Sequence, residues 1–132
     1  MRKLLFVLIA ILFALTAASP GFARDRELTF EWEQEVPADL AGWNLYVKAG
    51  SSGGGYLANY QLLTTIVYTG NILATYTSDV LMQSPDNETH EYFFVLTAFD
   101  LDGNESGASN EVSAIIDFIP PGAPTTFTVK IK

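Results

Sequence analysis

The chain has 132 residues, 48% of them hydrophobic, and it contains no cysteine, so disulfide bonds and cysteine-ligated metal sites are excluded. Its formal net charge of −8 is unfavourable for binding to nucleic acid or anionic lipid, and we expect neither as a partner. Because no disulfide can form, the hydrophobic core must hold the fold together alone.

The first 23 residues have the layout of a secretory signal peptide. A basic start at residues 1–3 precedes an apolar run at 4–15, and small residues then lead to Ala23. The run is twelve residues long, which fits a signal peptide, whereas a membrane-spanning helix needs about twenty. An uncleaved anchor is the alternative. We expect cleavage after Ala23, a secreted or periplasmic location, and no membrane span in the mature chain.

Residues 24–119 are expected to form one domain built from β-strands. Apolar and polar residues alternate over 28–33, which predicts a strand with one buried side and one solvent-facing side. The alternation returns at 43–48. The stretch 50–55 holds four glycines and no following lysine, so it predicts a flexible hairpin loop and not a phosphate-binding loop.

The second half of the domain contains further strand patterns separated by turns. Two runs rich in β-branched and aromatic residues, 60–68 and 72–82, flank a turn and predict a meander. Residues 91–99 have the most strand-like composition, Asp102-Gly103 predicts a hairpin turn, and 112–118 follow as the last strand. Short strands at regular spacing predict an all-β fold, an antiparallel sandwich.

Residues 120–132 form a separate C-terminal segment. Its prolines favour an extended connection, and beyond them apolar Phe127, Val129 and Ile131 alternate with polar residues, which predicts a further β-strand. This strand could fold back onto its own domain, add to the exposed edge of another copy, or remain frayed.

Three stretches of the sequence resemble a fibronectin type III domain: LTFEW at 28–32, DLAGWNLY at 39–46 and residues 92–113. The last hairpin, TAFDLDGNESGASNEVS, is most similar to that of small secreted bacterial members. The resemblance implies an immunoglobulin-like sandwich in which Trp32, Trp43 and Tyr92 are fold-defining, Trp32 on strand B and Tyr92 as the corner tyrosine opening strand F. The family's strand A is missing before Leu28, and 123–129 resembles the start of a following repeat.

Catalytic residues are scarce. His90 is the only histidine, so a serine-type triad would need it, and it lies beside a turn where histidines are usually exposed. Glu31, Glu33 and Glu35 share one strand face at a spacing of about 6.6 Å, near the range for inverting glycosidases. However, the outer face of a small sandwich offers no cleft to raise a carboxylate pKa and hold a sugar. We expect no enzyme and no cofactor, with glycan hydrolysis as the alternative.

Two further motifs have competing explanations. Asp100, Asp102 and Asn104 provide oxygen ligands at a density that suits calcium, but the glycine position does not match the helix-flanked calcium loop. A solvated hairpin turn explains them better. Asn87 and Asn104 each begin an N-glycosylation pattern, which matters only in an organism that glycosylates exported proteins in this way.

One outward-facing group of side chains is a candidate contact surface. If Trp43, Leu45 and Val47 face the core together with alternate residues of the later strands, then an apolar patch faces outwards: Tyr46, Phe93, Val95 and Ile115. A loop or the C-terminal strand could instead cover this patch. We expect a secreted, non-catalytic binding or structural module that contacts a protein or polysaccharide. The alternative is self-assembly through Phe127, Val129 and Ile131.

Overall fold

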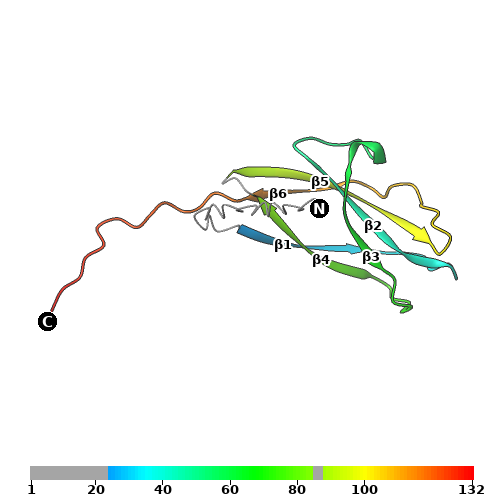
Figure 1. Ribbon diagram of the computed structural model, residues 1–132, viewed down its shortest axis with the longest axis horizontal. Helices are drawn as coiled ribbons and strands as arrows, with labels where there is room; N and C mark the ends of the chain where they lie inside the picture. Colours follow the sequence, from blue (N-terminus) through cyan, green and yellow to red (C-terminus); the bar gives the residue numbers. More distant parts are fainter. Residues whose placement is uncertain (1–23, 85–87) are drawn as a thin grey trace, which may run out of the picture.

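The computed structural model describes residues 24–84 and 88–132 and has an all-β fold (Figure 1). The predicted signal peptide and the glycosylation candidate Asn87 lie outside the described residues. The elements in chain order are β1 (Arg24–Trp32), β2 (Leu40–Ala49), η1 (Leu57–Asn59), β3 (Gln61–Val67), β4 (Tyr76–Ser84), β5 (Thr89–Asp100) and β6 (Val112–Asp117). Within those residues, no helix has the length and hydropathy needed to cross a bilayer.

The strands form two antiparallel sheets that pack as a sandwich, which confirms the predicted all-β class. One sheet pairs β1 with β4, and the other has the order β3-β2-β5-β6. Residues 68–75 therefore cross from one sheet to the other, and the predicted meander over 60–82 is wrong. A turn signal between two strand patterns marks a change of direction, but it does not distinguish a hairpin from a crossover.

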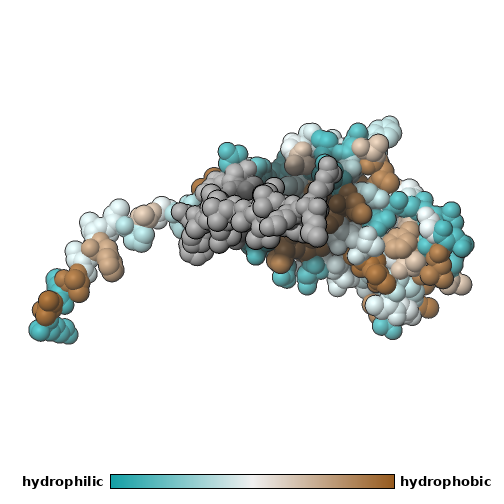
Figure 2. Space-filling view, in the orientation of Figure 1, coloured by the Kyte–Doolittle hydropathy of each residue, from teal (hydrophilic) through white to brown (hydrophobic). Residues whose placement is uncertain are grey.

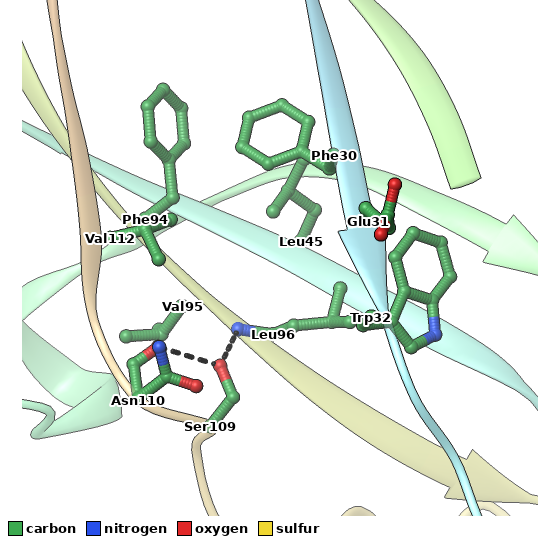
Figure 3. A pocket seen from close by; sticks show the side chains of 10 residues that line it. All are labelled: Phe30, Glu31, Trp32, Leu45, Phe94, Val95, Leu96, Ser109, Asn110 and Val112. Carbon is green, nitrogen blue, oxygen red and sulfur yellow. Dashed lines mark hydrogen bonds between the residues drawn. The ribbon is translucent and has the colours of Figure 1, made fainter. Parts of the chain in front are cut away.

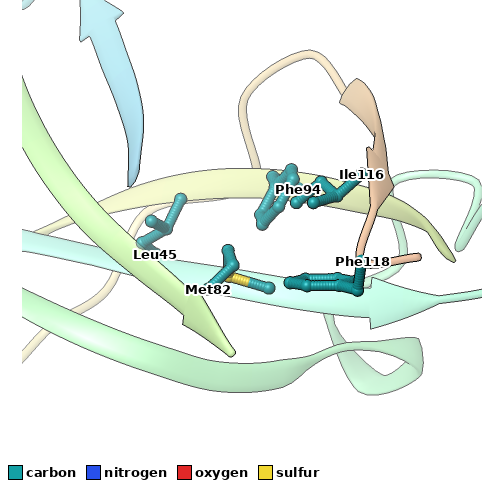
Figure 4. Close-up of a cluster of buried hydrophobic side chains, with 5 residues drawn as sticks. All are labelled: Leu45, Met82, Phe94, Ile116 and Phe118. Carbon is teal, nitrogen blue, oxygen red and sulfur yellow. The ribbon is translucent and has the colours of Figure 1, made fainter. Parts of the chain in front are cut away.

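The core lies between the two sheets because alternate residues of each strand face inwards. Phe94 is 1% exposed, and its ring meets that of Phe30 edge to face at a centroid distance of 4.8 Å. Figure 4 shows the larger buried cluster, which consists of Leu45, Met82, Phe94, Ile116 and Phe118. Fully burying one such side chain contributes about 1.5–3 kcal/mol.

A second cluster contains both tryptophans. Trp43 is buried and packs with Leu40 and Tyr76, and the rings of Trp32 and Trp43 lie 5.1 Å apart. Trp32 is only half-buried. Tyr92 is also half-buried, packs against the larger cluster, and lies 6.4 Å from the Phe94 ring. All three residues expected to define the fold thus contact the core.

Strand β1 has the predicted alternation but is incompletely covered. Leu28 and Phe30 are half-buried and contact the larger cluster, whereas Glu27, Thr29 and Glu31 are exposed. Among the described strands β1 pairs only with β4, from Arg24 opposite Ser84 to Trp32 opposite Tyr76. A two-stranded sheet covers only part of a four-stranded one, so the inward side chains of β1 stay partly accessible.

The predicted hairpin turn after β5 is confirmed. Gly103 has a φ of 85°, a conformation that glycine adopts without strain. One carboxylate oxygen of Asp100 accepts hydrogen bonds from the backbone N–H groups of Asp102 and Asn104, at 3.0 and 2.8 Å. The other accepts one from the Asn104 side-chain amide at 2.9 Å. Asp100 therefore holds the turn closed.

Two serine hydroxyls accept hydrogen bonds from backbone N–H groups of β5 beyond the residues that pair with β6. The N–H of Ser106 donates to the carbonyl of Ala98, and the N–H of Ala98 donates to the Ser106 hydroxyl. Ser109 makes the same reciprocal pair with Leu96, at 2.8 and 2.9 Å. Each hydroxyl takes the place of a backbone carbonyl, so residues 106–109 bulge from the sheet while its hydrogen bonds stay satisfied.

The C-terminal segment 120–132 forms no strand in the described chain. It leaves the sandwich after β6 and extends away from it (Figure 1). The predicted strand is thus absent from the isolated chain, and the fold-back onto its own domain is not adopted. Phe127, Val129 and Ile131 are exposed, at 94%, 86% and 97%.

Candidate functional site

The outer face of the β3-β2-β5-β6 sheet does not present the predicted apolar patch. Val95 is 1% exposed, so the expectation that it lies at the surface is wrong. Tyr46 and Phe93 are half-buried, and Ile115 alone of the four is mainly exposed, at 72%. Successive side chains of β5 point to opposite sides of the sheet, but their exposure does not alternate, because Phe94 and Val95 are both buried.

Glu105 occupies the middle of this outer face. Its Oε1 accepts hydrogen bonds from the hydroxyls of Tyr46 and Thr97, both at 2.5 Å, and from the amide of Asn44 at 3.2 Å. Burial raises the pKa of Glu105, but these hydrogen bonds outweigh it and hold the pKa below its usual value. The pKa of Tyr46 is raised by burial and by its bond to this carboxylate.

Glu111 fixes the glycine-rich loop at residues 50–55. Its carboxylate accepts hydrogen bonds from the Ser52 hydroxyl at 2.6 Å, the Gly53 N–H at 2.9 Å and the Tyr60 hydroxyl. The bonds from Ser52 and Tyr60 hold the pKa of Glu111 below its usual value. The loop was predicted to be flexible, but these contacts tie it to the chain just before β6.

The calcium candidates lie together in the turn after β5. Both carboxylate oxygens of Asp100 accept hydrogen bonds inside the turn, chiefly from Asn104, and these bonds lower its pKa. Asp102 and Asn104 are exposed. The described residues contain no group of three or more histidine, aspartate or glutamate side chains placed to hold a metal ion.

The catalytic candidates come from different strands, His90 from β5 and Glu31 from β1. His90 is half-buried, and its ring lies 6.1 Å from Phe118. Glu31, Glu33 and Glu35 are exposed as expected. However, Glu31 and Glu33 border a hollow beside the end of β1, so the expectation that no depression lies near them is wrong.

That hollow belongs to a surface we call the open flank: the edge of β1 that is unpaired among the described strands, together with the depression between β1 and residues 106–112. Figure 3 shows its deeper part, with Phe30 and Trp32 on one side and Ser109 and Asn110 on the other. The cavity encloses about 100 Å³ and reaches the core residues Leu45 and Phe94. For scale, an apolar cavity of roughly 150 Å³ holds a benzene ring.

Trp32, which borders the cavity, also carries an unsatisfied polar group. The indole N–H of Trp32 is buried and has no hydrogen-bond partner among the described residues. Such a group costs about 1–3 kcal/mol. The flank itself combines backbone that is unpaired among the described strands with an apolar cavity, features expected of a surface that another chain segment could cover.

Sequence reasoning missed the contacts of Glu105 and Glu111 and most features of the open flank. Glu105 and Glu111 looked like loop carboxylates because their partners lie up to 61 positions away along the chain. For the open flank, the sequence signal was the expectation that the strand A implied by the family resemblance does not precede Leu28. No family model, curated protein or solved structure gives a significant match to this chain. Its function is therefore inferred from these surfaces.

Proposed function

We propose that this chain is an exported, non-catalytic contact module that accepts an extended protein segment along its open flank. The observation that carries this proposal is an edge of β1 with no strand partner in residues 24–84 and 88–132, beside a cavity into the core. Export is supported by the signal-peptide pattern of the first 23 residues. A fibronectin type III fold is supported by the strand order, in which β1 and β4 face β3-β2-β5-β6 and a strand A would lie beside β1.

The physical basis is β-strand addition. An edge strand offers a row of N–H and C=O groups that an extended peptide can pair with, while alternate side chains of the peptide enter pockets. Strands β3, β4 and β6 also have one unpaired side among the described strands. The cavity that reaches Leu45 and Phe94 opens beside β1, so the added strand there would also extend the core.

Tryptophan fluorescence tests this proposal. The chain has two tryptophans, and Trp32 borders the cavity. Ten-residue peptides with an apolar residue at every second position are expected to shift the emission and saturate. Scrambled peptides of equal composition, and soluble glycans, are expected to cause no shift.

A matched pair of variants locates the binding. Asn110→Phe places a bulky side chain where Asn110 lines the cavity and is expected to weaken peptide binding. Gln61→Phe, on the exposed edge strand β3, is expected to bind normally. Equal binding by both variants, or no response to any alternating peptide, would contradict the proposal.

A further inference from the structure

The C-terminal segment has the pattern that an added strand needs. Phe127, Val129 and Ile131 are almost fully exposed and alternate with polar residues. Figure 2 shows this as brown and teal residues that alternate along a segment standing clear of the sandwich. Resting on the proposed function, we infer that residues 126–132 of one copy pair with β1 of the next copy and fill its open flank, head to tail.

Strand direction favours this partner. β6 runs opposite to β1, and its end lies beside the start of β1, where the Arg26 guanidinium donates to the Asp117 carbonyl at 3.3 Å. The C-terminal segment continues outwards from that end (Figure 1). In a second copy translated along the same direction, the segment meets the Trp32 end of β1 first and then runs towards Arg24. A second copy that is translated without rotation therefore presents its β1 antiparallel to the C-terminal segment of the first copy.

Pairing within one molecule is less favourable. The segment would first have to run back along β1 from Arg26 to Trp32, about 20 Å, and then reverse direction. Residues 119–126, three of them proline, reach about 28 Å when fully extended. They would have to span about 70% of this reach and then reverse direction sharply, whereas a neighbouring copy requires no reversal.

Side-chain chemistry sets the register. With Phe127 opposite Trp32, Val129 lies opposite Phe30 and Ile131 opposite Leu28, so each apolar residue of the segment faces an inward residue of β1. In the same register Lys132 lies opposite Glu27, and Lys130 lies between Glu27 and Glu31 on the solvent side. Opposite charges across neighbouring strands stabilise pairing.

The charges of the C-terminal segment and of β1 also favour their pairing. Lys130 and Lys132 are two of the five basic residues among 24–132, and residues 118–132 contain no acidic residue. The exposed side of β1 carries Glu27 and Glu31.

The contact uses two different surfaces of the same chain, the C-terminal segment and the open flank. Each added copy therefore leaves one flank unfilled and one segment unpaired. A head-to-tail contact between copies related by translation does not close, so it builds filaments.

Reciprocal charge reversal tests the inference. The double variant Lys130→Glu with Lys132→Glu has an acidic segment and an acidic flank, and Glu27→Lys with Glu31→Lys has a basic segment and a basic flank. Protein is produced from the full coding sequence, and its folding is checked by circular dichroism. Light scattering is expected to show that wild-type mass rises with concentration. Each double variant alone is expected to associate more than about tenfold more weakly.

Mixing the two double variants is the decisive step. Each segment then meets a flank of opposite charge, so an equimolar mixture is expected to assemble as the wild type does. Lys48→Glu, which changes a lysine outside both surfaces, is expected to assemble normally. A mixture that stays monomeric, or a wild type that is monomeric at every concentration, would overturn the inference. In the second case, alternating peptides that still shift the tryptophan emission would show that the proposed function survives.

Discussion

The hydroxyl of Tyr60 donates a hydrogen bond to the carboxylate of Glu111, 51 positions further along the chain. Tyr60 itself is buried, and its hydroxyl also accepts the N–H of Gly55 at 3.1 Å. One buried phenol thus joins the glycine-rich loop to the segment that leads into β6. That segment also contains the two serines that border the open flank, so the loop contact helps to fix one wall of the flank.

Gly53→Ala is expected to break this contact. A Cβ at position 53 would overlap the ring of Tyr60, so the ring would have to leave Glu111. Overpacking of this kind typically costs about 1–3 kcal/mol, measured as a lower free energy of unfolding in urea. Gly107→Ala is the control, because a Cβ there meets no atom within 4 Å. Equal stability of the two variants would contradict the role of this contact.

Acid is expected to destabilise the chain through Glu111, Glu105 and Asp100. Their pKa values are lowered in the folded chain, so the unfolded chain binds more protons in acid. Their contribution is therefore present above the ordinary values of 4.5 for glutamate and 3.8 for aspartate and is lost as the pH falls through the lowered folded values. Urea midpoints measured across this range are expected to fall, and less steeply in Glu111→Gln. A flat profile would contradict this.

Ser109→Ala is expected to lower the free energy of unfolding by about 1 kcal/mol, because the N–H of Leu96 loses its hydroxyl acceptor. Amide exchange of Leu96 should become faster in the same variant. Ser113→Ala, an exposed serine on β6, is the control and should change neither quantity. If both variants behave alike, the hydrogen bond from the N–H of Leu96 to the Ser109 hydroxyl does not stabilise the sheet.

Phe94→Ala is expected to cost about 3–5 kcal/mol, because it leaves a cavity in the larger core cluster. Ile115→Ala, on the same sheet but facing solvent, should change stability by no more than about 0.5 kcal/mol. Chemical denaturation of both variants gives the comparison. A large effect at Ile115 would mean that the outer face is covered in solution by a contact that the isolated chain does not show.

Local patterns in the sequence predicted the strands well. The alternation at 28–33 became β1, the run at 91–99 became most of β5, and Asp102-Gly103 became a turn. These features depend on neighbouring residues alone, since side-chain period and turn chemistry act over a few positions. The same patterns could not show which strands pair, so a crossover at 68–75 was mistaken for a meander.

Contacts between distant residues explain the remaining differences. Val95 was expected at the surface because it alternates with Phe94, yet both are buried. Glu111 gave no local sign that it would bind the glycine-rich loop. The C-terminal segment has a strand pattern but no strand partner within its own domain, and a pattern alone cannot say which chain provides one.

The most direct test of the open flank is amide hydrogen exchange of the full chain at low and high protein concentration, followed residue by residue. Strand addition predicts that amides of β1 and of residues 126–132 become protected together as the concentration rises, while those of another edge strand, β3, stay unchanged. Unchanged exchange in β1 both at high concentration and with saturating alternating peptide would contradict the account.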